Sequence, residues 1–165
     1  IHTDLFNFEG IDETLDLNQT DCLDFTETML GTRLFLCANV LEHLTAKTRV
    51  TAVKAIATVL RPGDFLLVTV PQSYPYHPDP IDTMFRPSPE DLSALFDLHW
   101  LKTQTIEAGS FSDDLKGMSP FKRARKFIKP FWVFQSPRNY ISNIHRLTFL
   151  TRPYRISLVF GRKVV

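Results

Sequence analysis

The proline-rich stretch YHPDPIDTMFR combines residue types that can move protons and bind anions. It places His77, Asp82 and Arg86 within ten residues of the chain. A histidine with an ordinary pKa of about 6.5 can exchange a proton near neutral pH, and prolines stiffen the loop that carries it. The stretch therefore predicts a general base at His77 with Asp82 beside it. The alternative is that His77 only packs or caps, and that Asp82 and Arg86 form an ion pair that fixes the loop.

A second group of polar residues follows an apolar run in LFLCANVLEHL, at Asn39, Glu42 and His43. In open α/β sheets, ligands bind outside the carboxyl ends of the strands. Polar side chains at such an end face a crevice, so they avoid the cost of burial without a partner. We therefore expect this segment to form the rim of a site.

The elements around these residues predict a βαβ unit. Residues 33–38 and 65–70 are apolar on both faces, which is typical of parallel strands covered by helices, and Pro71 closes the second run. Residues 46–60 between them have the apolar spacing of an amphipathic helix, which a Pro-Gly pair ends. The apolar stripe of this helix consists of Ala46, Val50, Val53, Ala57 and Leu60.

The rest of the chain continues an α/β pattern. A helix is expected after Ser88, which can cap it, with Pro89 in the first turn and Asp91 at the spacing of a capping box. Alternating residues predict strands over 100–108 and 154–163, and two short strands are expected before residue 18. We therefore predict a single α/β domain over residues 1–165, with a doubly wound and mostly parallel sheet.

The charged residues are divided unevenly along the chain. Residues 1–32 hold eight acidic residues and no Lys or Arg, whereas residues 115–165 hold twelve Lys or Arg and no acidic residue. Much of the basic part falls in an insert before the last strand, residues 109–153, which is longer than ordinary connections. The division indicates either an anionic partner for the basic end or its packing against the acidic end.

Within this insert, SPFKRARKFIKP predicts a basic amphipathic helix that starts at Ser119 and Pro120. Its apolar residues fall on one side. Its basic residues fall on the other and are Lys122, Arg123, Arg125, Lys126 and Lys129. Such a helix, next to the aromatic run 131–134, is suited to lie on an anionic membrane or to cover a groove. The alternative is a lid or a homo-oligomer element whose aromatic residues belong to a core.

The composition excludes several classes of protein. No apolar run approaches the roughly 20 residues that a membrane span requires. The two cysteines are too few for a disulfide framework, and the five histidines do not combine with them at metal-ligand spacing. We expect no metal and a reducing, cytoplasmic location, with peripheral membrane contact as an addition. The chain begins with Ile and shows no secretory pattern, so we expect its natural start to lie elsewhere.

CANVLEHL, the helix after it and VLRPGDFLLVTVP together resemble the second half of the class I S-adenosylmethionine-dependent methyltransferases. YHPDPIDTMFRPSPEDLSALF is similar to a type 11-like subgroup with a yH...P.D.fR pattern after the same strand. Asp64 stands where the family usually has the second glycine of a turn. The resemblance covers about residues 1–108 and the final strand. It implies methyl transfer from S-adenosylmethionine to an acceptor, with a small molecule or a glycan as the favoured class.

The resemblance also implies roles for individual residues. Asp4 is similar to the acid that binds the ribose hydroxyls of the cofactor, and carboxylates suit this role because they accept hydrogen bonds strongly. Taken alone, an acid such as Asp4 or Asp16 in a short exposed turn is better explained by solvation. The other assignments that the resemblance implies are Asp16 and Leu17 at the adenine, Ala38 and Asn39 at the methionine part, and Tyr76 and Arg86 at the acceptor.

The glycine-rich signature of the family and its first strand have no counterpart in these residues. In the usual order that strand lies between the second and the fourth, so its absence leaves backbone groups of both neighbours without partners. We expect that the chain does not fold as the family does by itself, and that a longer protein, another segment or another chain fills the gap.

Two alternatives to a methyltransferase remain. One is another nucleotide-binding α/β enzyme, although G-x-G-x-x-G and P-loop motifs are absent. The other is a non-catalytic methyltransferase-like scaffold or membrane-surface module.

Overall fold

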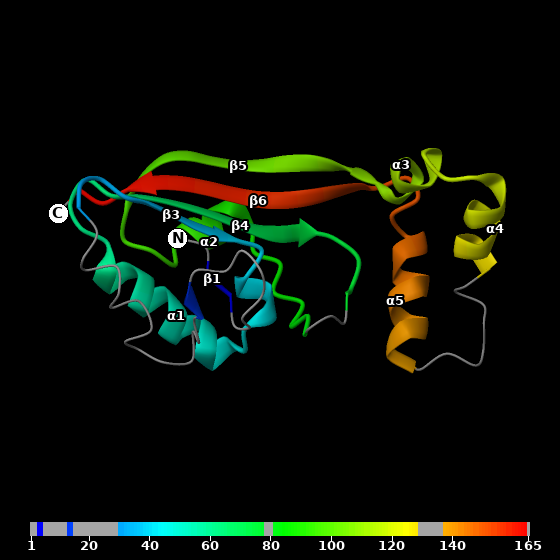
Figure 1. Cartoon of the computed structure of the whole chain (residues 1–165), viewed down its shortest axis with the longest axis horizontal. Helices are drawn as coiled ribbons and strands as arrows, with labels where there is room; N and C mark the ends of the chain where they lie inside the picture. The colour runs from blue at the N-terminus through cyan, green and yellow to red at the C-terminus, as the bar shows by residue number, and fades with distance from the viewer. Residues whose placement is uncertain (1–2, 5–12, 15–29, 78–80, 129–136, 165) are drawn as a thin grey trace.

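The computed structural model describes residues 3–4, 13–14, 30–77, 81–128 and 137–164 (Figure 1). In this part of the chain a four-stranded sheet is accompanied by helices, and three further helices gather at one end of the long axis. The fold is α/β, as the sequence predicts.

The main sheet is mixed, with the strand order β3-β4-β6-β5. Strands β3 and β4 are parallel, whereas β6 lies antiparallel between β4 and β5. Within the described main sheet, the expected parallel pairing is therefore found for β3 and β4 only, because the apolar pattern of a strand does not encode its direction. The strands are β3 (Leu34–Ala38), β4 (Phe65–Ser73), β5 (His99–Ser110) and β6 (Pro153–Arg162). A separate parallel pair consists of β1 (Thr3–Asp4) and β2 (Glu13–Thr14).

The predicted βαβ unit is confirmed. All five residues of β3 pair in parallel register with β4, and α1 (Ala46–Val59) connects the two strands. Thr45 caps this helix, since its hydroxyl accepts a hydrogen bond from the N–H of Thr48 at 3.2 Å. Such a cap satisfies one of the backbone donors that the first turn of a helix leaves without a partner.

Helix α1 packs on the sheet through a face that overlaps the predicted one only in part. Val53 and Leu60 of the predicted stripe join the main core, but Val50 is 55% exposed, and the buried residues of the helix are Ala52, Ala55 and Ile56. Both sets of residues have helical spacing, because α1 carries apolar residues on more than one side. Periodicity alone does not choose between the two faces, and contact with the sheet does.

The main core lies between the sheet and helices α1 and α2 (Pro89–Ser93). Helix α2 has the predicted capping box: the Ser88 hydroxyl accepts from the N–H of Asp91 at 3.1 Å, and the Asp91 carboxylate accepts from the N–H of Ser88 at 3.4 Å. Both helices contribute to one cluster with Leu66 and Val70, which share a face of β4 because side chains alternate along a strand. The two helices therefore cover the same face of the sheet.

The opposite face of the sheet is less covered. Leu34 and Leu36 of β3 are 63% and 67% exposed, and the rings of Phe65 and Phe160 stack with centroids 5.5 Å apart. Within the described residues β3 is also the edge of the main sheet, since it pairs with β4 alone. The helices on both faces that a doubly wound sheet requires are not seen in this part of the chain.

Strand β4 continues beyond Pro71, where the sequence predicted its end. Pro71 lies opposite Ile156 of β6, and the pairing shifts in register between Pro71 and Ser73. Proline donates no ladder hydrogen bond, and such an irregularity accommodates it inside a strand. The extended strand then delivers Tyr76 and His77 past the edge of the sheet.

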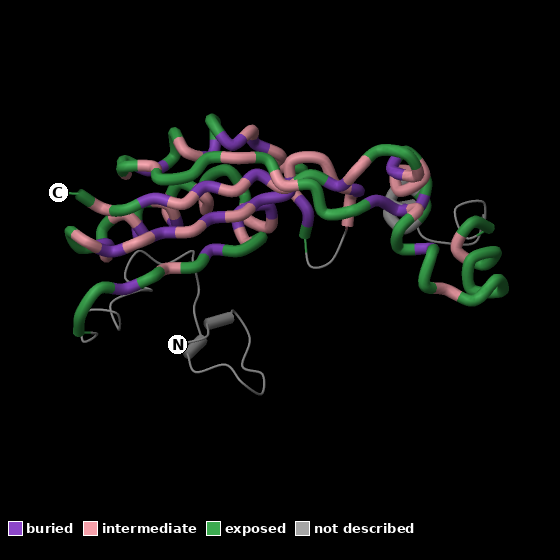
Figure 2. The backbone as a smooth tube through the Cα atoms, turned by 90° about the horizontal axis from the view of Figure 1, so that it is seen from above, coloured by how far each residue is buried: buried purple, intermediate pink, exposed green. Residues whose placement is uncertain are grey.

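The insert forms three helices, of which the sequence predicted only the second. They are α3 (Phe111–Lys116), α4 (Pro120–Ile128) and α5 (Pro137–Leu147). A second core cluster of Phe111, Leu115, Phe149 and Tyr154 ties this end of the molecule to β6. Much of this end is exposed (Figure 2). Lys129 and the aromatic run 131–134 lie outside the described residues. In the part of the chain that the structure covers, every helix is too short or too polar to span a bilayer.

Candidate functional site

The carboxyl ends of β3 and β4 meet at one edge of the sheet, where Asn39 turns the chain. Asn39 has a φ of 54°, a left-handed conformation that asparagine adopts more readily than most residues. Its N–H donates to the carbonyl of Thr69 at 2.9 Å, so the parallel ladder continues one residue past β3. Ala38 and Asn39 are both exposed at this edge. Their contact with a cofactor stays a prediction.

Glu42 lies just beyond this turn, in η2 (Leu41–His43), a single turn of 3-10 helix. Its residue is only 1% exposed, so the prediction that it faces an open crevice is wrong. The N–H and hydroxyl of Thr83 hold its main-chain carbonyl at 2.9 and 2.7 Å. Neither carboxylate oxygen has a hydrogen-bond partner, and burial raises the pKa of Glu42. A buried carboxyl in this condition is costly when charged and is a candidate proton carrier.

Arg49 on α1 joins η2 to the loop that follows β4. Its Nε donates to the carbonyl of Leu41 at 3.1 Å, and its Nη2 donates to the carbonyl of Leu44 at 2.9 Å and to Oγ1 of Thr83 at 3.1 Å. Its guanidinium carbon also lies 3.6 Å from the ring centroid of Phe85, a cation–π distance. One side chain therefore positions both segments that carry the polar residues of this edge.

His43 and His77 meet across the edge, with ring centroids 5.3 Å apart and planes at 89°. Nδ1 of His43 lies 2.6 Å from the carbonyl of Ile81, so Nδ1 carries the proton of that hydrogen bond. Its Nε2 is 3.9 Å from Oε1 of Glu42. Nδ1 of His77 lies 3.1 Å from Oδ2 of Asp82, at ion-pair distance but without hydrogen-bond alignment. The structure therefore brings the predicted pair His77 and Asp82 together.

Asp82 organises the loop around this pair. Its carboxylate accepts hydrogen bonds from Nη2 of Arg86 at 2.5 Å, from the N–H of Met84 at 2.8 Å and from the N–H of His77 at 3.2 Å. Burial opposes the charge of Asp82, but these donors outweigh it and hold the pKa of Asp82 below its usual range. The loop-fixing ion pair of Asp82 and Arg86 is thus present, and it coexists with the contact to His77.

Two tyrosines connect this cluster to the helices of the insert. The backbone N–H of Tyr76 donates to Nδ1 of His145 on α5 at 2.9 Å. The ring of Tyr74 lies edge-on to His77, with centroids 5.8 Å apart, and 4.8 Å from the ring of Tyr154 in the second core cluster. Sequence reasoning missed His145, because a partner 69 residues further along the chain gives no local signal.

Glu42, His43 and His77 also form a group whose metal-ligand atoms all lie within 4.8 Å of one another. Imidazole nitrogen and carboxylate oxygen are donors that zinc ions accept. However, burial raises the pKa of Glu42 although the charge of Arg86 opposes that rise, and burial lowers the pKa of Arg49 although the charge of Glu42 opposes that fall. Two positive charges therefore already act on this carboxylate and repel a divalent cation, so the group is better suited to handle a proton.

The residues expected at the adenosine end of a cofactor are placed only in part. Asp16 and Leu17 lie outside the described residues. Asp4 belongs to β1 and lies opposite Thr14 of β2. The assignments of these three residues to ribose and adenine remain predictions.

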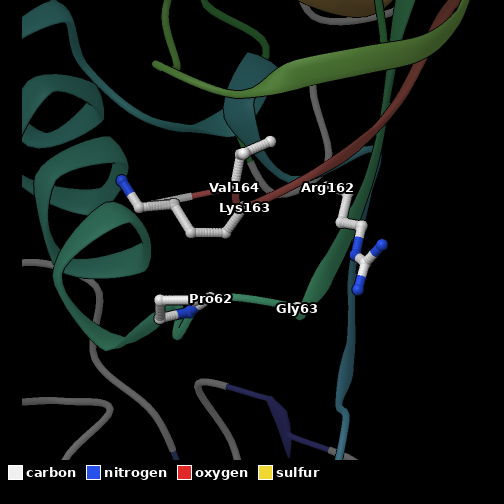
Figure 3. Close-up of a pocket in the computed structure, with 5 residues that line it drawn as sticks. All are labelled: Pro62, Gly63, Arg162, Lys163 and Val164. Carbon is white, nitrogen blue, oxygen red and sulfur yellow. The ribbon is translucent and has the colours of Figure 1, made fainter.

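A hollow elsewhere in the fold is of another kind. It has a volume of about 340 Å³ and is lined by Pro62, Gly63, Arg162, Lys163 and Val164 (Figure 3). These residues flank the start of β4 and the end of β6, at the opposite end of β4 from the Asn39 edge. The N–H of Gly63 donates to the carbonyl of Lys163 at 2.8 Å, so backbone closes part of its wall. No carboxylate, imidazole or thiol lines the hollow, and it is not a candidate reaction site.

Comparisons with known proteins add little to this geometry. No family model matches the chain, and no curated protein sequence matches it. Among solved structures, the chain is similar to a coclaurine N-methyltransferase whose crystal structure is described as bound to N-methylheliamine and SAH. The identity is 17% and the TM-score is 0.47, and the match covers 82% of this chain and 49% of that chain. The chain thus spans about half the length of the protein it matches. At this distance the likeness assigns no residue and no activity.

Proposed function

We propose that this chain forms part of an S-adenosylmethionine-dependent methyltransferase whose reaction takes place at the carboxyl edge of β3 and β4. The observation that carries the proposal is the parallel pairing of these strands, with Asn39, His43 and His77 gathered at their ends. Such an edge is where open α/β sheets bind ligands. The sequence resemblance of CANVLEHL and VLRPGDFLLVTVP supports the choice of cofactor.

In this proposal the cofactor lies along the edge, with its methionine part against Ala38 and Asn39. Both residues are exposed there, so a ligand can reach them without displacing a core side chain. Asp4 binds the ribose hydroxyls, and Asp16 and Leu17 meet the adenine. The ribose hydroxyls and the exocyclic amine donate hydrogen bonds, and carboxylates accept them.

The acceptor, a small molecule or a glycan, lies on the side of His77 and contacts Tyr76 and Arg86. Its oxygen or nitrogen nucleophile attacks the methyl carbon of the sulfonium. The carbon–sulfur bond breaks, and its electron pair stays on sulfur, so that S-adenosylhomocysteine leaves with a neutral thioether. His77 takes the proton of the nucleophile at Nε2, because its Nδ1 faces Asp82 at 3.1 Å. The carboxylate of Asp82 stabilises the imidazolium that forms.

Positioning supplies more of the rate than the base does. Holding two reactants in the correct geometry contributes about 7 to 11 kcal/mol, whereas a general base contributes about 100-fold to 10,000-fold, or about 3 to 5 kcal/mol. Loss of His77 should therefore leave a slow methyl transfer rather than none.

Calorimetry with S-adenosylmethionine and S-adenosylhomocysteine tests the cofactor directly. The protein should bind both, and Asp4→Asn should weaken binding about tenfold to 100-fold, which is the usual loss of a hydrogen bond to a charged group. His77→Ala should bind the cofactor as the wild type does, because it acts on the acceptor. The matched control is Asp97→Asn, which changes an exposed acid between α2 and β5. Absence of binding by the wild-type protein would refute the proposal and favour the non-catalytic module.

A further inference from the structure

Helix α4 leaves both its charged and its apolar side chains in solvent. None of its nine residues is buried, and Phe121 and Ile128 are 81% and 58% exposed. At about 100° per residue, Phe121, Phe127 and Ile128 fall on one side of the helix and its bases on the other. The bases are Lys122, Arg123, Arg125 and Lys126. An exposed apolar side on a protein surface marks an interaction site when it has a matching partner.

Helix α4 is nevertheless held in place. Arg123 donates from Nε to the carbonyl of Met118 at 3.0 Å and from Nη2 to the carbonyl of Lys116 at 2.7 Å, so it closes the end of α3. The ring of Phe127 contacts that of Phe111, with centroids 6.4 Å apart. These contacts fix the helix at one end of the molecule (Figure 1) and leave Phe121 in solvent.

The positive charge of α4 is not neutralised within the described part of the chain, although Lys116 and Arg155 elsewhere in this basic region each pair with an acid. Residues 115–165 contain twelve Lys or Arg and no acidic residue. The preceding acids are engaged elsewhere: Asp113 pairs with Lys116 at 2.6 Å, and Asp114 accepts the hydroxyl of Tyr154 at 2.9 Å. Among the described residues, no ion pair involves a base of α4. The charge is therefore available to an external anion.

We propose that α4 docks on the surface of a bilayer that contains anionic phospholipids. Phe121 and Ile128 enter the boundary between headgroups and acyl chains, and the bases lie among the headgroups. Charge alone would serve a nucleic acid or free phosphate equally well. The exposed apolar side favours the bilayer, because an amphipathic helix gains binding energy from burying that side in the interface. The inference does not depend on methyl transfer.

Vesicle co-sedimentation at low salt tests the proposal with the full protein. It should bind phosphatidylcholine vesicles that contain phosphatidylglycerol and should not bind phosphatidylcholine alone. The triple variant Lys122→Gln, Arg125→Gln and Lys126→Gln spares Arg123, which closes α3. Each base near an anionic surface strengthens partitioning about fivefold, so the triple variant should lose about 100-fold. A triple variant that sediments as the wild type does would overturn the proposal.

Two matched controls separate a specific surface from general charge. Lys47→Gln, Lys54→Gln and Lys102→Gln remove the same charge from exposed positions of α1 and β5 and should bind as the wild type does. Phe121→Ser should weaken vesicle binding even though it keeps every charge, whereas Leu101→Ser, at another exposed apolar residue, should not. Equal losses in both lysine variants would overturn the proposal. The proposal would also be overturned if Phe121→Ser bound vesicles as the wild type does and an oligonucleotide removed it from them. That result would assign the surface to nucleic acid.

Discussion

Replacement of Asp64 by Asn should destabilise the joint between β3 and the turn before β4. Asp64 and Arg33 are 1% and 7% exposed. Oδ1 of Asp64 accepts the N–H of Arg33 at 2.9 Å, and Oδ2 accepts Nε of Arg33 at 2.9 Å and the N–H of Arg61 at 2.8 Å. Removing one partner of a buried ion pair costs about 3 to 5 kcal/mol, because the other charge stays buried without compensation. Asp64→Asn should therefore lower the free energy of unfolding by about this amount.

The same pair predicts how stability depends on pH. Burial works against the charge of Asp64, but hydrogen bonds from Arg33 and Arg61 outweigh it and lower the pKa of Asp64. A carboxyl with a lowered folded pKa stabilises the fold above its unfolded pKa of about 3.9, and this stabilisation is lost as the pH falls through the folded pKa. The wild type should thus lose stability below about pH 4, and Asp64→Asn should lose less of it over the same range.

Urea unfolding followed by circular dichroism, repeated from pH 7 to pH 3, measures both effects. Glu107→Gln is the control, since its pair with Arg155 is exposed on both sides and such pairs contribute about 1 kcal/mol or less. The double variant Arg33→Met and Asp64→Asn removes both charges and keeps an acceptor near the N–H groups of Arg33 and Arg61, so it should cost less than Asp64→Asn alone. An Asp64→Asn protein within about 1 kcal/mol of the wild type at pH 7 would show that the buried pair does not stabilise this joint.

Three further predictions concern the buried groups beside the site. The stability of Glu42→Gln relative to the wild type should be higher at pH 7 than at pH 4. The folded pKa of Glu42 is raised, so its charged carboxylate destabilises the wild type above the unfolded pKa. Urea unfolding at the two pH values checks this, and a larger loss of stability by the variant at pH 7 than at pH 4 contradicts it. Burial and the nearby Glu42 raise the pKa of Cys37 to about 12, so its thiol should resist iodoacetamide at pH 8 in the native protein and react in urea, as peptide mass mapping would show. Rapid labelling of native Cys37 would count against this. Dialysis against EDTA should leave the melting temperature unchanged, whereas a drop that zinc reverses would show that Glu42, His43 and His77 hold an ion.

The local parts of the fold could be predicted from the sequence. The βαβ unit and the capping box of α2 depend on residues that are close together in the chain, so their signals are complete within a short window. The pair of His77 and Asp82 belongs to the same class, since five positions separate them. The basic side of α4 was equally visible, because a helix of nine residues shows its periodicity directly.

Properties that depend on distant partners could not be predicted. The sequence predicts Glu42 as a residue at the rim of a site, but hydrogen bonds from Arg49 and Thr83 hold its segment where the side chain is buried. Nothing in the sequence near Arg49 or Thr83 indicates this role. Asp64 reads as a small departure from a glycine in a turn. Its importance comes from Arg33, which lies 31 positions earlier and looks in the sequence like an ordinary start of a strand. The antiparallel direction of β6 likewise depends on the path of the insert that connects β5 to β6.

The hydrogen bond from Tyr76 to His145 has a mechanical consequence. The backbone of Tyr76, next to the candidate base His77, is hydrogen-bonded to His145 of α5. Helix α5 lies at the same end of the molecule as α4, which carries the proposed lipid-facing surface. A shift of α5 must either break this bond or drag residue 76 with it. Attachment to a bilayer would then act on the position of His77 through this hydrogen bond and through the ring contacts of Tyr74. An acceptor embedded in the lipid would meet a base whose position depends on docking.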